Sequence, residues 1–167
     1  AHGSLVEVSC WARDAAGLDA KGPARNVTVA LPDFEGAPES AEAWATHALA
    51  EAGALLASGG PDAAIQMVAL ALSTFPGGRA SEATVASALA IITQASAVLP
   101  PAPEAAVAVS RALSSAFASG PPSADSVAAA GAAVASMLDS LPPGVLTPDV
   151  LEPVAGALGG MSAAAAG

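Results

Sequence analysis

Few residues in the 167-residue chain are of the types that catalysis or metal binding uses. The chain has two histidines, His2 and His47, one cysteine, Cys10, and no tyrosine. A nucleophile needs a base beside it, and a zinc site needs about four His, Cys or carboxylate ligands. His47 stands four residues before Glu51, a spacing typical of a solvent-exposed contact on one helix face. We therefore expect no catalytic, cofactor-binding or metal-binding residue, and the sequence predicts that the protein is not an enzyme.

The acidic residues follow no ligand pattern. They do not form the spacing of an EF-hand calcium loop, and no Gly-Lys-Ser/Thr follows a glycine-rich stretch as a phosphate-binding loop requires. The formal net charge is −10, and residues 33–167 hold twelve acidic side chains against Arg79 and Arg111. An acidic surface repels phosphate backbones and anionic lipid headgroups. We therefore expect no nucleic-acid partner and no insertion of this segment into a membrane.

Two residues are candidates for covalent modification if the protein is extracellular. Asn26, the only asparagine, opens the N-glycosylation triplet Asn26-Val27-Thr28 on the polar side of a predicted strand. Cys10 falls on the apolar side of another predicted strand. For Cys10 two interpretations stay open, a small buried hydrophobe in a cytosolic protein or a disulfide to a residue outside this chain in an extracellular one.

The segments that would carry these two residues have the period of strands. In LVEVSCWA (residues 5–12) and NVTVAL (residues 26–31), apolar and polar residues alternate, as in half-buried strands. The two segments could pair as a hairpin, which alone is marginal in water. Residues 1–32 are therefore predicted to be the C-terminal strands of an immunoglobulin-like or β-sandwich module, whose other strands lie upstream, and residues 33–40 are predicted to be a linker.

The rest of the chain has helical composition and punctuation. The whole chain has 47 alanines, and 40 of them lie in residues 33–167; alanine is the best helix former. Glycine or proline pairs recur at intervals of about 20 residues and separate segments of three to five helical turns; they are Gly59-Gly60, Gly77-Gly78, Pro100-Pro101, Pro121-Pro122, Pro142-Pro143 and Gly159-Gly160. Ser81 and Ser123 occupy N-cap positions, and Thr147-Pro148 opens the last segment. The sequence predicts an array of about six short helices over residues 41–160 and a frayed tail over residues 161–167.

Repetition within this array is weak at the level of sequence. The interval between the Pro-Pro pairs is 21 residues, but the segments share no signature of a named repeat family. The fold class is thus expected to be mainly α, with a β-hairpin from the end of a β-sandwich module before the helices.

Two stretches resemble a known family. VEVSCWARDAAGLDAKGPARNVTVALP (residues 6–32) resembles the closing strands of an immunoglobulin-like or polycystin-repeat-like domain. HALAEAGALLASGGPDAAIQMVALALSTF (residues 47–75) resembles the helical region after the receptor-for-egg-jelly (REJ) module of polycystin-like membrane proteins. The resemblance implies that the helices form the helical half of an autoproteolysis-inducing (GAIN-like) domain. The family's cleavage tripeptide has no match, because His2-Gly3-Ser4 and His47-Ala48-Leu49 stand in the wrong context, so we expect no self-cleavage.

The resemblance also implies a location and a role. The chain would lie on the extracellular side of the plasma or ciliary membrane, as a glycoprotein segment for spacing, adhesion or partner contact in a larger membrane protein. Its partners would be other domains of the same polypeptide or another protein. The alternative is an independent soluble, alanine-rich helical interaction protein in which residues 1–37 are an N-terminal arm, and a weaker third interpretation is an alanine-rich structural protein of the cell surface.

Overall fold

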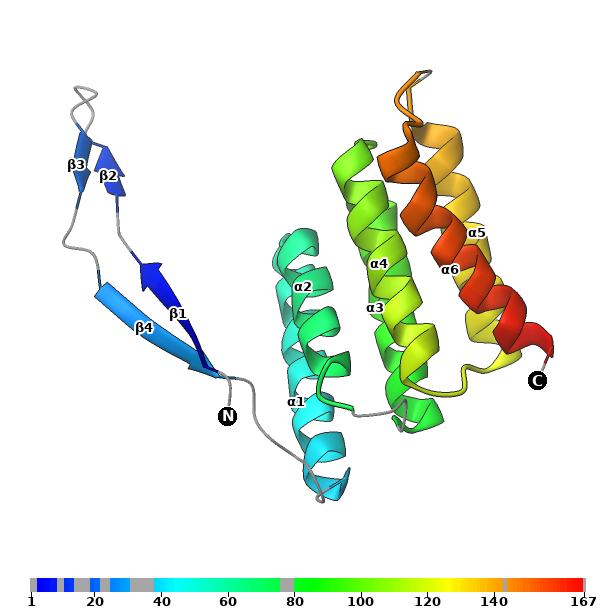
Figure 1. The fold of residues 1–167 in the computed structure, drawn as a ribbon, viewed down its shortest axis with the longest axis horizontal. Helices are drawn as coiled ribbons and strands as arrows, with labels where there is room; N and C mark the ends of the chain where they lie inside the picture. Colours follow the sequence, from blue (N-terminus) through cyan, green and yellow to red (C-terminus); the bar gives the residue numbers. More distant parts are fainter. Residues whose placement is uncertain are drawn as a thin grey trace. The chain divides into compact units, whose positions relative to one another are not determined.

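A computed structural model describes residues 3–8, 11–13, 19–21, 25–30, 38–75, 80–142 and 144–166. The chain divides into two compact units, Ala1–Asp33 and Phe34–Gly167. Figure 1 shows strands in the first unit and helices in the second. Each unit has its own internal contacts.

Four short strands are described in the first unit, β1 (Gly3–Val8), β2 (Trp11–Arg13), β3 (Asp19–Lys21) and β4 (Arg25–Ala30). β1 and β4 pair antiparallel, with Glu7 opposite Asn26. β2 and β3, which lie between β1 and β4 in the sequence, form a second antiparallel ladder with Trp11 opposite Lys21. The interpretation of the unit as a β-hairpin that ends a β-sandwich module stays a prediction.

The second unit is mainly α, as the sequence predicts, and six helices are described in it. They are α1 (Pro38–Ala57), α2 (Pro61–Leu72), α3 (Glu82–Val98), α4 (Pro103–Ser119), α5 (Ala124–Ser140) and α6 (Pro148–Ala166). The connections are short, which is typical of antiparallel neighbours in helical arrays.

The six helices form three helical hairpins that stack in two layers. Each hairpin pairs an odd helix with the even helix that follows it, so α1 packs on α2, α3 on α4, and α5 on α6. Between hairpins, α3 packs on both α1 and α5, and α4 packs on both α2 and α6. The odd helices therefore make one layer and the even helices the other, with α3 and α4 at the centre (Figure 1).

Local signals in the sequence account for the helix ends. The Ser81 and Ser123 hydroxyls accept hydrogen bonds from the backbone amides of Thr84 and Ser126, which confirms both predicted N-caps. The C-cap residues of α3 and α5 have extended backbones because each is followed by a proline. α1 ends differently. Gly59, two residues beyond its end, has φ 87°, and the Gly59 and Gly60 amides donate to the Leu56 and Leu55 carbonyls. This pattern is a Schellman motif, which favours glycine at its left-handed position.

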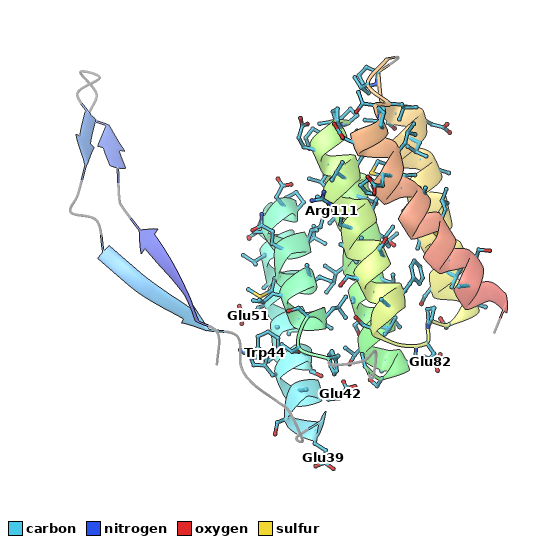
Figure 2. The ribbon with its side chains drawn as sticks, viewed as in Figure 1. Glu39, Glu42, Trp44, Glu51, Glu82 and Arg111 are labelled. Carbon is cyan, nitrogen blue, oxygen red and sulfur yellow. The ribbon has the colours of Figure 1, made fainter. Side chains whose placement is uncertain are left out.

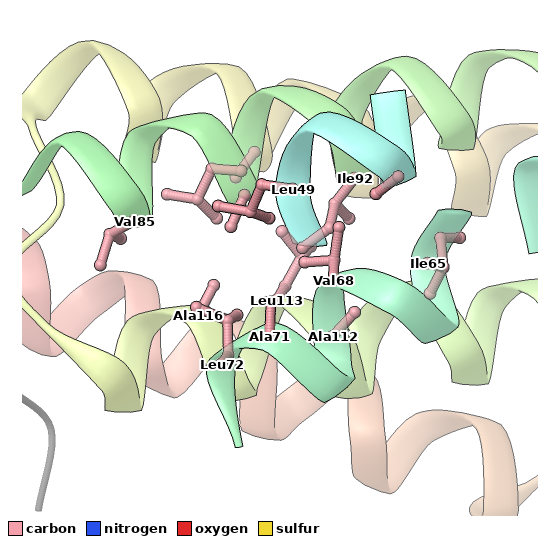
Figure 3. Packing of buried hydrophobic residues seen from close by; sticks show 14 of the residues in the cluster. Leu49, Ile65, Val68, Ala71, Leu72, Val85, Ile92, Ala112, Leu113 and Ala116 are labelled. Atoms are coloured by element: carbon pink, nitrogen blue, oxygen red, sulfur yellow. The ribbon is translucent and has the colours of Figure 1, made fainter. Parts of the chain in front are cut away.

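The core is built from small side chains. Its largest fully buried members are leucines, isoleucine and valines, and alanines fill the positions between them (Figure 3). Alanine and glycine faces let helices approach closely, as α6 does to α4 at Gly160, where an added Cβ would lie 3.2 Å from the Cβ of Phe117. Ala48, Ala52, Ala71, Ala88, Ala112 and Ala116 belong to the same cluster as Leu72, Leu89, Ile92 and Leu113.

The last helix differs from the expectation. The array was expected to close at residue 160, before a frayed tail, but α6 continues through Gly159-Gly160 to Ala166 and also contains Pro153. Each interior glycine costs a helix about 1 kcal/mol relative to alanine. Here α6 packs along α4, with Gly160 against Phe117, so tertiary contact offsets the weak local propensity.

Candidate functional site

A cluster of polar side chains joins the first helix to the third. The Glu42 carboxylate, on α1, accepts a hydrogen bond of 2.5 Å from the backbone amide of Ser81 and one of 2.5 Å from the Thr84 hydroxyl. The Ser81 hydroxyl lies 3.3 Å from the same carboxylate and itself accepts from the Thr84 amide at 3.2 Å. Glu42 therefore caps the N-terminus of a helix other than its own.

The chemistry of this cluster is that of a cap. The first amides of a helix lack partners within the helix and carry a partial positive charge, which a carboxylate stabilises. Both Glu42 oxygens already accept hydrogen bonds. The adjoining hollow, of about 460 Å³, is lined by Glu42, Thr46, Leu49, Ala50, Ser81, Ala83, Thr84, Ser87 and Ile91. These residues offer hydroxyls and one carboxylate, and the carboxylate is engaged in the cap of α3.

A second hollow lies where α3, α4 and α5 meet. It has a volume of about 340 Å³ and is lined by Thr93, Ser96, Ala97, Leu99, Pro100, Pro101, Ala105, Ala133, Ser136, Met137 and Ser140. The Ser96 and Ser140 hydroxyls donate to backbone carbonyls of their own helices, at 2.7 and 2.8 Å. No lining residue is charged, so the hollow is suited at most to a small neutral molecule.

The residues singled out in the sequence are not brought together. His47 and Glu51 are both exposed on α1, as expected for a solvated helix face. Asn26 lies in β4, opposite Glu7 in the register. His2 and Cys10 lie outside the described residues.

Two further observations concern metals and membranes. Within the described ranges, no group of three or more His, Cys, Asp and Glu side chains is placed to hold a metal ion. None of the helices α1 to α6, over their described residues, combines the length and the apolar character that a bilayer span requires.

The charge of the helical unit has a regular distribution. Every one of the six helices has an acidic residue in its first turn, and none has a basic residue in its last turn. Figure 2 places Glu39, Glu42 and Glu82 at the end of the array where α1 and α3 begin. Acidic residues at helix N-termini are stabilising, but they also leave this end of the array negatively charged.

Sequence reasoning missed an apolar feature of α6 and the connection before it. Leu146 in this connection and Leu151 and Leu158 in α6 are 47%, 46% and 48% exposed, whereas most large aliphatic side chains of the unit are buried. The signal for two of them was available in the even helices. A proline followed by an acidic residue opens α4 at Pro103 and α6 at Pro148. When the two helices are aligned at these prolines, Leu151 and Leu158 of α6 fall at positions that are buried in α4.

Comparisons with known proteins identify no family for this chain. No protein-family model matches the chain, and no match was found among curated proteins or among solved structures. The resemblance to polycystin-like proteins therefore stays a prediction. What the helical unit does must be argued from its own surfaces.

Proposed function

We propose that the helical unit is a non-catalytic structural and interaction module. The observation that carries this proposal is the stacking of three helical hairpins in two layers, in which contacts run only between neighbouring hairpins. Stacked helical hairpins build extended surfaces that bind other proteins without a deep pocket. Such a surface needs the shape of the array rather than reactive side chains.

The chemistry of the described side chains supports a non-catalytic role. The Glu42 carboxylate, which stands beside hydroxyls, is engaged in capping α3. The hollow at α3, α4 and α5 is lined by aliphatic and hydroxyl side chains alone. General acid–base or nucleophilic catalysis would need a titratable group within hydrogen-bond reach of a reacting atom.

The larger context we propose is the extracellular side of a polycystin-like membrane protein in the plasma or ciliary membrane. In this context the first unit ends a β-sandwich module, Asn26 carries a glycan, and Cys10 pairs with a cysteine outside this chain. The order of the units supports it, because a strand-containing unit of residues 1–33 precedes a helical unit of residues 34–167. The resemblance in residues 6–32 and 47–75 supplies the rest.

One observation favours the alternative, an independent soluble helical interaction protein. The helical unit has its own extensive core, formed by α1 to α6, and so needs no first unit for its packing. Under this alternative residues 1–37 are an arm, and Cys10 is an unpaired thiol.

Cross-linking in cells that express the protein natively tests the interaction role. The cells would be treated with a carbodiimide, which couples carboxylates of this chain directly to lysine amines that lie beside them. Lys21 is the only lysine of the chain, so a product of any other lysine reports a residue outside it. We expect such products from exposed acids of the helical unit. A unit whose carboxylates couple to no outside lysine would contradict the proposal.

The location is tested separately, by brief protease treatment of intact cells. Peptides of the helical unit are expected to be released before lysis if the segment is extracellular. Release only after lysis would overturn the extracellular context and favour the soluble alternative.

A further inference from the structure

The even helices carry the same two apolar stripes in each hairpin. The first stripe of α4, made of Ala105, Val109, Ala112 and Ala116, is buried. Its counterpart 45 residues later in α6 is also buried, and consists of Val150, Val154, Ala157 and Met161. A buried set recurs at an offset of 41 residues from α4, namely Ala64, Val68 and Ala71 of α2 and Phe75, three residues beyond the end of α2. The stripe thus occupies equivalent positions in all three even helices.

The second stripe of α4 is covered by the next even helix. It contains Ala106, Ser110 and Leu113, all 0% exposed, and continues to Phe117. Ala106 packs in one cluster with Val150 of α6. At the other end of the helix, Phe117 lies against Gly160 of α6. The two ends of this stripe, Ala106 and Phe117, therefore lie against the hairpin that follows.

In α2 most of the second stripe is buried. Ile65 and Leu72 are 4% and 2% exposed, Ala69 between them is half-buried, and α4 is the even helix that packs on α2. Figure 3 shows Leu72 and Ala71 in the same cluster as Ala112, Leu113 and Ala116 of α4. Among the even helices, α4 is therefore the one that packs on an even helix on both sides, α2 before it and α6 after it.

In α6 the second stripe is open. The residues at these positions are Leu151, Ala155 and Leu158, and all three are exposed, the leucines by 46% and 48%. Burial of a leucine side chain is favourable relative to its exposure to water. These two leucines therefore occupy positions that the two preceding hairpins cover, while no helix of the described unit covers them.

We propose that the stripe of Leu151, Ala155 and Leu158 is the docking site for one α-helix of a partner protein segment, seated on α6 as α6 is seated on α4. This inference rests on the interaction role proposed above and names the surface and the partner's chemistry. The contact continues an interface that the array already forms twice, from α2 to α4 and from α4 to α6.

The shape of the stripe determines the apolar face of the partner helix. At the position that Ala106 has in α4, α6 has the larger Leu151. The partner helix must therefore present small side chains opposite Leu151. α6 itself does this toward α4, with Gly156 next to Ser114 and Gly160 next to Phe117. We infer a helix with alanines or glycines at a spacing of three or four residues.

Charge determines the flanks of the partner and disfavours a second copy of this chain. The exposed Glu152 follows Leu151, Asp149 is exposed in the same first turn, and α6 contains no basic residue. Two copies joined through α6 would bring like charges together, which is unfavourable at an interface. Lysine or arginine beside the apolar face of the partner would complement Glu152.

The test uses carbodiimide cross-linking of the full chain in cells that express it natively, read out at Glu152 and Asp149. We expect coupling to a lysine of a segment whose sequence has small residues at helical spacing. In the double variant Leu151→Glu, Leu158→Glu, the yield of these products should fall about tenfold or more, as for loss of a central contact. The matched control is Leu70→Glu, which changes an exposed leucine of α2 and should leave the yield unchanged.

The outcomes separate this inference from the proposed function. Coupling of Glu39 or Asp62 to outside lysines, with none at Glu152 and Asp149, would overturn the docking site and leave the interaction role standing. Products that persist in the double variant, or that map to a segment without helical spacing, would also overturn it. Sedimentation that shows dimers of the wild-type chain, and monomers of the double variant alone, would assign the stripe to a second copy and contradict the basic partner. Circular dichroism of both variants must match the wild type.

Discussion

The carboxylate of Glu42 on α1 accepts a hydrogen bond from the backbone amide of Ser81, which immediately precedes α3. The two residues are 39 positions apart. A contact that is usually made by a residue within the same helix is here made by another hairpin. The N-terminus of α3 is thereby held against α1, and the cap joins the first hairpin to the second.

Glu42→Ala is expected to destabilise the helical unit by about 1–3 kcal/mol, because it removes charge-assisted hydrogen bonds to the Ser81 amide and the Thr84 hydroxyl. The free energy of unfolding would be measured by urea titration followed by circular dichroism. Glu51→Ala is the matched control on the same helix, where the side chain is exposed, and should change stability by no more than about 0.5 kcal/mol. Equal effects of the two variants would contradict the capping role.

Ser110→Ala is expected to stabilise the unit. The Ser110 hydroxyl is fully buried and has no hydrogen-bond partner within the described structure. An unsatisfied buried hydroxyl costs about 1–3 kcal/mol, and alanine is also the better helix former. Ser140→Ala, at an exposed serine that donates to the Ser136 carbonyl, should gain only the smaller propensity term. A lower thermal midpoint for Ser110→Ala than for the wild type would show that the hydroxyl is satisfied in solution.

Two neighbouring glycines of α6 should respond differently to alanine. A Cβ at Gly159 would meet nothing within 4 Å, so Gly159→Ala should gain about 1 kcal/mol from helix propensity. A Cβ at Gly160 would lie 3.2 Å from the Cβ of Phe117, and the resulting crowding costs about 1–3 kcal/mol. Differential scanning calorimetry should therefore rank Gly160→Ala below Gly159→Ala. The reverse ranking would mean that α6 does not pack on α4 at Gly160.

The helical unit should resist proteolysis as one body. Residues 38–160 are expected to survive brief thermolysin treatment as a single fragment, because the connections are short and the Ala80 amide donates to the Ser119 carbonyl across two of them. Mass spectrometry of the products would check this. Simultaneous cleavage in the connections at residues 58–60, 99–102 and 120–123 would rule out a cooperative array.

Asn26 should carry a glycan if the extracellular context is right. The native peptide that contains Asn26 would then shift in mass after enzymatic deglycosylation, and Asn26→Gln would remove the shift. An unmodified Asn26 in a protein whose neighbouring glycosylation sites are occupied would count against this part of the proposal.

Local chemistry was readable from the sequence, whereas contacts between hairpins were not. Ser81 and Ser123 could be identified as caps because the residues that they bond lie three positions away. Glu42 could not, since its partners are about 40 residues distant and many acids were equally plausible. The continuation of α6 through Gly159-Gly160 was missed because packing against Phe117, rather than propensity, stabilises that turn.

The repeat was hidden for a related reason. Equivalent positions in α2, α4 and α6 lie 41 and then 45 residues apart. What recurs at them is whether the side chain is buried or exposed, and not the type of residue. Alanine fills many positions of both kinds, such as the buried Ala112 and the exposed Ala118, so the period leaves little trace in residue identity. Burial in three dimensions was needed to align the helices and to find the open stripe at Leu151 and Leu158.

The stacking of the hairpins also has a mechanical consequence. In the described unit α1 and α2 contact α3 and α4, but neither contacts α5 or α6. A pulling force along the chain would therefore peel one hairpin at a time, since removing an end hairpin breaks only one interface. Each release of about 40 residues would lengthen the tether by on the order of 100 Å. The array would act as an extensible spring between whatever its two ends are attached to.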